Sequence, residues 1–501
     1  MSPSILVFLV AGVAAGSGPL PTARFEPLLV GPAVPLDLPP PPPPGTELED
    51  HEAMEGVADS MTSAHFAIKW GAEWEPEDVW IERALEDLEE TYALQVVDLG
   101  FEEPDGMSVA RFNVYVADTG IIGPGGTPLD VGVPSGGMGL DDDGWPFVGV
   151  SALNWDMDAE WAANGWSAEG EVIEVYMVHE FHHATQYAAG LFYDHFGGSW
   201  WFLEGLATWS ETRQVPGSAM TWWWFPAVYY LPEVPFQAPY EFWPDDASEE
   251  EALFCSGHAY ALFVLPLYLS DELATDDLVV QWVNDDRTHV DFMEGLEAVL
   301  SERGDDLGAV VTAVWGAIQS RRQGDPEALA WAEANVGPPP GLDHNPTLTL
   351  EVGADAVAPP DEWRPGRFGA NVLRVEAPED DLVFSIEPDA AGSAGTPVRW
   401  GAAAVLCTDD LCADEVLAVD ATGRAEWTVA AAGEDLVDLV LVPLTDEYVE
   451  DEAFGYLASA DVAPPPDDEE PGGCGCRTSR RPAGSALPLA LLLLAARRRS
   501  S

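Results

Sequence analysis

The stretch VYMVHEFHHATQYAAG, residues 175–190, decides the fold because its apolar residues fall on nearly every face of a helix. A helix of this kind is buried, so its polar side chains need partners. Residues four apart share one helix face, and His179 and His183 therefore project together, as two ligands of one metal ion would. Glu180 completes the pattern H-E-x-x-H, in which the imidazoles bind zinc and the glutamate takes a proton from water.

A third ligand is predicted on the next helical segment, SWWFLEGLATWSET, residues 199–212. Glu204 lies near its start, after a glycine-rich turn at Gly197 and Gly198. Two helices joined by this turn would bring Glu204 opposite the histidine pair. Two histidines and one glutamate leave the fourth position of a tetrahedral zinc ion to water, which is the catalytic form of such a site.

HEFHH followed by LEGLATW resembles the gluzincin metallopeptidases, whose second helix supplies a glutamate ligand. The resemblance implies that His179, His183 and Glu204 bind zinc and that Glu180 is the general base. It also implies that a histidine or tyrosine from a later element stabilises the oxyanion. His258 and Tyr260, in CSGHAYALFVLPLYL, are the candidates for this catalytic role, and the alternative is that they satisfy buried hydrogen bonds.

Two other histidines and one acidic turn receive different predictions. His182 faces away from the pair. It is predicted to be either a residue that contacts the metal ligands without binding the metal, or a surface group. His195 lies in the turn between the two helices, where a loop role is the default. LDDDGW, residues 140–145, offers oxygen ligands that suit calcium, but a solvated turn is the preferred interpretation.

The fold predicted for residues 61–337 is an α+β, zincin-like catalytic domain with a small sheet and the H-E-x-x-H helix in its core. The resemblance implies that the strand before the motif helix, residues 147–152, is the sheet edge that pairs with an extended peptide. Proline 76 is predicted at the first position of a helix. The expected strands are residues 65–70, 110–118 and 147–155; the expected helices are residues 76–97 and a series over 171–335.

Residues 342–462 change in character and predict an all-β sandwich that acts as a binding or spacing module. Short alternating runs follow one another between Gly, Pro and Asp clusters. Cys407 and Cys412 flank a short loop and are predicted to form a disulfide, whereas Cys255 is predicted to be a buried thiol. The expected strands lie in TLTLEV (347–352), NVLRVEA (371–377), LVFSIEP (382–388), AEWTVAAA (425–432) and LVDLVLVPL (436–444).

The charge balance argues against a nucleic-acid partner. The chain has 20 Lys and Arg against 88 Asp and Glu, a formal net charge of −68, so phosphates would be repelled. Lys69 is its one lysine. A secreted protein kept soluble by charge and a protein adapted to high salt both fit this composition.

The two ends of the chain are predicted to carry targeting signals, and membrane contact is expected only through them. Residues 1–16 read as a signal peptide, 17–60 as a proline-rich linker and 463–473 as a proline and acidic linker. Residues 474–501 combine a Gly-Cys doublet, a short apolar run and terminal arginines, and resemble the myxobacterial sorting tag MYXO-CTERM. The resemblance implies a secreted or outer-surface location; an ordinary weak tail anchor is the alternative.

These features together predict a secreted or surface-displayed zinc endopeptidase that hydrolyses protein or peptide substrates. Two alternatives stay open: a surface adhesin that keeps a gluzincin-like core without turnover, and a zinc hydrolase that acts on a non-peptide bond. Convergence of His179, His183 and Glu204 favours an enzyme, whereas a solvent-facing Glu204 favours the adhesin.

Overall fold

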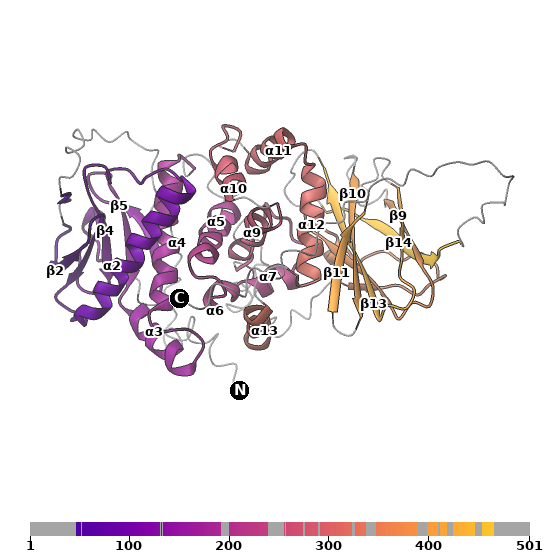
Figure 1. Ribbon diagram of the computed structural model, residues 1–501, viewed down its shortest axis with the longest axis horizontal. Helices are drawn as coiled ribbons and strands as arrows, with labels where there is room; N and C mark the ends of the chain where they lie inside the picture. Colours follow the sequence, from indigo (N-terminus) through magenta and orange to yellow (C-terminus); the bar gives the residue numbers. More distant parts are fainter. Residues whose placement is uncertain are drawn as a thin grey trace, which may run out of the picture. The chain divides into compact units, whose positions relative to one another are not determined.

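The computed structural model describes residues 47–464, apart from 52, 131, 133, 192–199, 239–254, 256, 274–275, 289–290, 323–325, 337–346, 389–397, 409–410, 418–423 and 446–452. It has an α+β fold with several sheets, which confirms the predicted class (Figure 1). The predicted signal peptide and sorting tag, and most of both linkers, lie outside the described residues.

Six strands form the first sheet, in the order β2-β3-β4-β6-β5, with β1 paired to the start of β4. Strands β3, β4 and β6 run parallel, and β2 and β5 flank them in antiparallel pairing. Their bounds are β1 Glu49–Asp50, β2 Val57–Thr62, β3 Phe66–Gly71, β4 Ala110–Ala117, β5 Gly136–Leu140 and β6 Pro146–Ser151.

Helices α2 (Asp78–Tyr92) and α4 (Glu171–Ala188) cover one face of this sheet (Figure 1). Phe181 of α4 packs edge-on against Phe66 and Phe112 of β3 and β4, with ring centroids 5.3 and 5.6 Å away. All three rings are at most 3% exposed. The H-E-x-x-H helix is therefore anchored to the sheet by the residue next to Glu180, as predicted for a core helix.

Several element boundaries differ from the prediction, and residues 49–50 and 57–60, predicted as part of a linker, lie in strands β1 and β2. Proline 76 does not begin a helix: α2 starts at Asp78, after the extended residue Glu77, and continues into the π-helix η1 (Ala93–Leu99). The predicted strand 147–155 ends at Ser151, and the helix α3 (Leu153–Asn164) begins two residues later. Leu153, Trp155 and Met157 alternate along the sequence as in a strand. In helix α3, however, the Asn154 side chain donates to a backbone carbonyl oxygen and the Asp158 carboxylate accepts from a backbone amide.

The prediction that residues 147–152 form the sheet edge is wrong. Strand β6 lies inside the sheet, between β4 and β5, and β5 forms the edge. The sequence of β5 is GGMGL, whose three glycines lack the side chains that favour strands. Strand β5 pairs with β6 in a hairpin that turns at residues 141–145, and its glycines hide this strand from the local pattern.

Helices occupy the middle of the chain, as predicted. The core that they share is rich in tryptophan, including the fully buried Trp209, Trp282 and Trp315. Their bounds are α5 Trp200–Gln214, α6 Ala219–Trp222, α7 Phe225–Tyr230, α9 Val264–Asp271, α10 Asp276–Val283, α11 Phe292–Arg303, α12 Leu307–Gln319 and α13 Pro326–Asn335; the short 3-10 turns are η2 Pro124–Gly126 and η3 Asp361–Trp363.

Two further sheets follow, in the orders β11-β10-β13-β8-β7 and β12-β9-β14, and Trp400 and Tyr456 lie in the core between them. The five strands predicted here are confirmed. Three others, β10, β11 and β14, were not predicted; alanine, which favours strands less than β-branched residues do, supplies three residues of β10 and two of β14. The bounds are β7 Thr347–Thr349, β8 Asn371–Glu376, β9 Leu382–Pro388, β10 Arg399–Thr408, β11 Leu411–Val416, β12 Ala425–Val429, β13 Leu436–Leu444 and β14 Tyr456–Val462.

Both predictions for the described cysteines are confirmed. Cys407 and Cys412 stand opposite each other in the β10–β11 hairpin and form a disulfide. Cys255 is a buried thiol, only 5% exposed.

Lys69, on strand β3, is almost fully buried. Its ammonium group donates a hydrogen bond of 2.9 Å to the carbonyl oxygen of His51 and lies 5.9 Å from the centroid of the Tyr115 ring. Burial lowers the pKa of Lys69, and the nearby charges of Asp50 and Asp141 oppose this effect. With its one lysine buried, the chain has only arginine as a strongly basic side chain for its surface.

Within the described part of the chain, no helix combines the length and the apolar character that crossing a membrane requires.

Helix α12 covers the five-stranded sheet, and Asp306 caps its amino terminus with a 2.9 Å hydrogen bond from the Ala309 amide. We expect Asp306→Ala to lower the free energy of unfolding by about 1 kcal/mol, because the amide loses its acceptor. Asp306→Asn keeps an acceptor and should retain most of the stability. Urea unfolding of the three proteins checks this; equal stability of the Ala and Asn variants would contradict it.

Candidate metal centre

The three predicted ligands converge between helices α4 and α5. His179, His183 and Glu204 are each less than 9% exposed, and together they can hold a metal ion. The Nε2 atom of His179 lies 3.0 Å from Oε2 of Glu204 and 3.2 Å from Nε2 of His183. The Nε2 atom of His183 lies 3.4 Å from the same Glu204 oxygen. The two helices therefore bring one atom from each side chain to a single point.

These three separations suit a small metal ion. Ligand atoms bound tetrahedrally at about 2.0–2.1 Å stand roughly 3.3 Å apart, and the three observed values lie on either side of that distance. Two imidazoles and one carboxylate are also a donor set that zinc accepts readily. Both the distances between the ligand atoms and their chemical types therefore suit a metal ion.

Helix α5 can approach its neighbours closely because a glycine follows Glu204. A side-chain carbon at Gly205 would stand 3.2 Å from the carbonyl carbon of Leu262, in the segment that carries Tyr260. On the other side, the amide of Gln186 on α4 donates to the carbonyl oxygen of Leu203, at 2.9 Å. These two contacts set the depth and position of Glu204.

A second glutamate on α5, Glu211, was not predicted. Its Oε1 atom accepts a 2.7 Å hydrogen bond from Nδ1 of His179, and its Oε2 accepts one of 2.6 Å from the hydroxyl of Thr221. Nδ1 therefore carries the proton, and Nε2 offers its lone pair to a metal. Glu211 comes seven residues after Glu204, two helical turns on the same face, and this spacing could have revealed it.

Gln186 orients the other histidine ligand. Its amide nitrogen donates to Leu203, so its oxygen is the atom that accepts from Nδ1 of His183, at 2.8 Å. His183 consequently also offers Nε2 to the centre. Gln186 comes three residues after His183 on the same helix, so the two side chains share one helix face.

The buried charges alter one another's pKa values. Burial raises the pKa of a carboxyl, but the charge of His183 and hydrogen bonds from both imidazoles outweigh it and lower the pKa of Glu204 to about 2. Burial lowers the pKa of His179, yet hydrogen bonds to Glu204 and Glu211 raise it well above the usual value. The metal-free centre therefore favours an ionised Glu204 and protonated imidazoles, and a metal ion has to displace a proton to bind.

Glu180, the predicted general base, is buried beside the ligands and touches the edge strand β5. Burial raises the pKa of its carboxyl, and the charges of His179 and His183 oppose the rise. A side-chain carbon at Gly136 would lie only 2.7 Å from Oε1 of Glu180. The absence of a side chain at Gly136 thus gives Glu180 its position.

His182 takes neither of its predicted places. It is fully buried, and its Nδ1 lies 3.2 Å from the side-chain oxygen of Gln95 on η1, with its ring edge-on to Phe101. Burial, followed by the charges of His183 and His179, lowers its pKa well below the usual value. His182 is a neutral core residue that joins α4 to η1.

The two candidates for oxyanion stabilisation differ in their surroundings. The Tyr260 ring stacks on the His179 imidazole at 5.9 Å and on Trp224 at 4.5 Å, so Tyr260 stands next to the ligands. His258 is 2% exposed, and burial lowers its pKa to about 3. His195 and the glycine-rich turn lie outside the described residues.

The acidic turn LDDDGW does not gather its carboxylates around one point. Asp141 accepts hydrogen bonds from the amides of Asp143 and Trp145 and pairs with His51, whereas Asp142 accepts from the Gly125 amide. His179, His183 and Glu204 are the one metal-competent group of three in the described part of the chain. The preferred turn interpretation agrees with this geometry.

No protein-family model matches the chain, and no curated protein matches it either.

Glu211→Gln should weaken metal binding about 10- to 100-fold, because the carboxylate that orients His179 and strengthens its basicity is lost. Equilibrium competition with a chelator measures the dissociation constant for zinc. Glu160→Gln, an exposed glutamate on α3, removes the same charge away from the site and should leave the constant unchanged. An equal effect of both substitutions would mean that only the overall charge matters.

Proposed function

We propose that the protein is a zinc-dependent endopeptidase with a zincin-like core and a carboxyl-terminal β-sandwich. The observation that carries the proposal is the convergence of the His179 and His183 imidazoles and the Glu204 carboxylate, with Glu180 beside them. A structural zinc site closes all four positions with protein ligands, whereas three ligands leave one position for water. This favours an enzyme over an adhesin.

Each side chain has a distinct part in the proposed reaction. His179, His183 and Glu204 would hold the zinc, which would act as a Lewis acid on a water molecule and on a carbonyl group. Glu180 accepts the proton of the attacking water and delivers it to the departing amine. Tyr260, next to His179, is the better placed candidate for the developing oxyanion.

A peptide substrate is favoured because the sheet edge lies next to Glu180. Strand β5 ends the hydrogen-bonded order of the first sheet, and Gly136 on it is in close contact with the Glu180 side chain. An extended peptide can add to such an edge through backbone hydrogen bonds, which places its carbonyl groups along the site. Strand β5 therefore takes the role that was expected of residues 147–152.

A secreted or surface-displayed location accompanies this proposal. It depends on the apolar segment near residue 1 and on the tag-like residues 474–501. A disulfide between Cys407 and Cys412 agrees with an oxidising compartment.

The test is zinc content and casein cleavage by the purified chain, with Glu180→Gln and Glu204→Ala. We expect about one zinc per chain in the parent and in Glu180→Gln, and loss of zinc in Glu204→Ala. Cleavage should fall about 10²- to 10⁴-fold in Glu180→Gln, because the proton acceptor is removed. Bound zinc without cleavage of any peptide by the parent would instead favour a binding protein or a hydrolase of another bond.

Two neighbouring glycines provide a matched test of the Glu180 position. Gly136→Ala puts a methyl group against the Glu180 carboxylate and should lower kcat at least tenfold with zinc retained. Gly137→Ala meets no atom within 4 Å and should leave kcat near that of the parent. Equal rates in the two variants would show that β5 does not position the base.

A further inference from the structure

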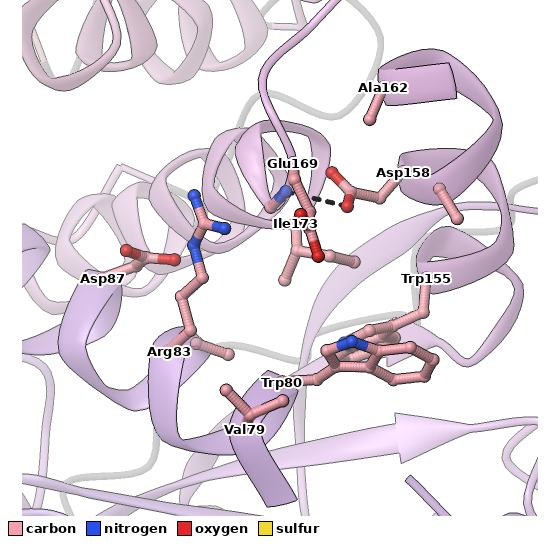
Figure 2. Close-up of a pocket in the computed structure, with 12 residues that line it drawn as sticks. Val79, Trp80, Arg83, Asp87, Trp155, Asp158, Ala162, Glu169 and Ile173 are labelled. Carbon is pink, nitrogen blue, oxygen red and sulfur yellow. Dashed lines mark hydrogen bonds between the residues drawn. The ribbon is translucent and has the colours of Figure 1, made fainter. Parts of the chain in front are cut away.

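A cavity of about 330 Å³ lies away from the metal centre, between α2, α3 and the start of α4 (Figure 2). Its volume falls in the range of small-molecule sites. Ile173 of α4 lines it, and this residue precedes His179 by six positions, about 9 Å along the helix. The α2 and α3 side of α4 borders the cavity, whereas the metal ligands face α5.

The walls of the cavity are largely apolar. Trp155 and Ile173 are buried, whereas Trp80 and Val79 on α2 are 37% and 59% exposed at its rim. Figure 2 shows Trp80 and Trp155 together on one side. An exposed tryptophan beside a hollow of this size offers both an apolar surface and an aromatic face, and aromatic faces attract cations.

Three of the four titratable side chains that line the cavity are carboxyls. Asp87, Asp158 and Glu169 line it together with one cation, Arg83 (Figure 2). The Asp158 carboxylate accepts hydrogen bonds from the amides of Gly170 and Val172, at 2.8 and 3.0 Å. Those amides therefore do not attract an anion, although they stand at a helix amino terminus.

Asp87 adds a buried acceptor. Its Oδ2 atom is buried and has no hydrogen-bond partner among the described residues. Burial, and then the charge of Glu174, raise the pKa of its carboxyl to about 7. An unsatisfied buried carboxylate oxygen is costly, and a donor or a positive charge nearby would relieve that cost.

We propose that this cavity binds an organic cation, an ammonium or guanidinium group carried on an apolar chain. The apolar part lies against Trp80, Trp155 and Ile173, and the charge lies towards the carboxylates. Arg83 opposes the ligand: its guanidinium lies against Gly170, where an added side-chain carbon would stand 2.3 Å from Cζ. Such a ligand is either a lysine or arginine side chain of a peptide or a free amine. The site is independent of the proposed peptidase activity.

The experiment is calorimetric titration of the full chain with n-hexylammonium, n-hexanol and hexanoate. We expect hexylammonium to bind once per chain and at least about fivefold more tightly than hexanol, the effect of one charge pair at about 4 Å in water. Tighter binding of hexanoate than of hexylammonium would overturn the proposal.

Variants of residues that line the cavity show where the ligand binds and which ligand charge the site prefers. Ala162→Trp should fill the cavity and weaken hexylammonium about tenfold, and Trp80→Ala, at the exposed rim, should weaken it without a risk to folding. Glu169→Gln should weaken the cation about fivefold, and Arg83→Gln should strengthen it by a similar factor. Weaker binding in Arg83→Gln, or full binding in both Trp80→Ala and Ala162→Trp, would refute the site.

Two further measurements distinguish the possible sources of the ligand and test whether the cavity is separate from the metal centre. A peptide with blocked ends and a central lysine is compared with its norleucine counterpart. If the lysine peptide binds more tightly than hexylammonium, the ligand is a side chain of a protein; if it binds no better, the ligand is a free amine. Glu180→Gln should bind hexylammonium like the parent, and loss of binding in that variant would contradict a separate cavity.

Discussion

Two carboxylates buried between α4 and α5 are the constraint on which the rest of the structure depends. A glutamate out of water is costly unless opposite charges and hydrogen bonds surround it. Glu204 meets two imidazoles, and Glu211 meets the outer nitrogen of His179 and the hydroxyl of Thr221. Helices α4 and α5 must therefore keep one position relative to each other. The sheet, the tryptophan-rich core and Gly205 hold them in that position.

The same burial that makes the site costly also makes it specific. Both Nδ1 atoms are engaged, by Glu211 and Gln186, so the imidazoles can offer only Nε2 to a metal. Rotation of either ring would break a hydrogen bond in a place that water does not reach easily. The site is thus arranged before any metal binds, and binding requires little reorganisation of the chain.

The sequence pattern predicted the features that depend on residues close together in the chain. The i, i+4 spacing identified His179 and His183, and the next helical pattern identified Glu204. Pattern could not identify the partner of His182, since Gln95 is 87 positions away. It also misplaced the sheet edge, because the glycines of β5 carry no strand signal and the hairpin that β5 forms with β6 was therefore missed. Glu211 was within reach through its two-turn spacing from Glu204.

The burial of Lys69 has a consequence for the chemistry of the protein surface. Its amine is the one lysine amine of the sequence, and it is bonded to a carbonyl oxygen inside the fold. Acylating reagents and lysine-directed crosslinkers would find no side-chain amine to react with while the fold is intact. A protease that cuts after lysine would likewise have no accessible bond, so the chain would resist such enzymes in a medium that contains them.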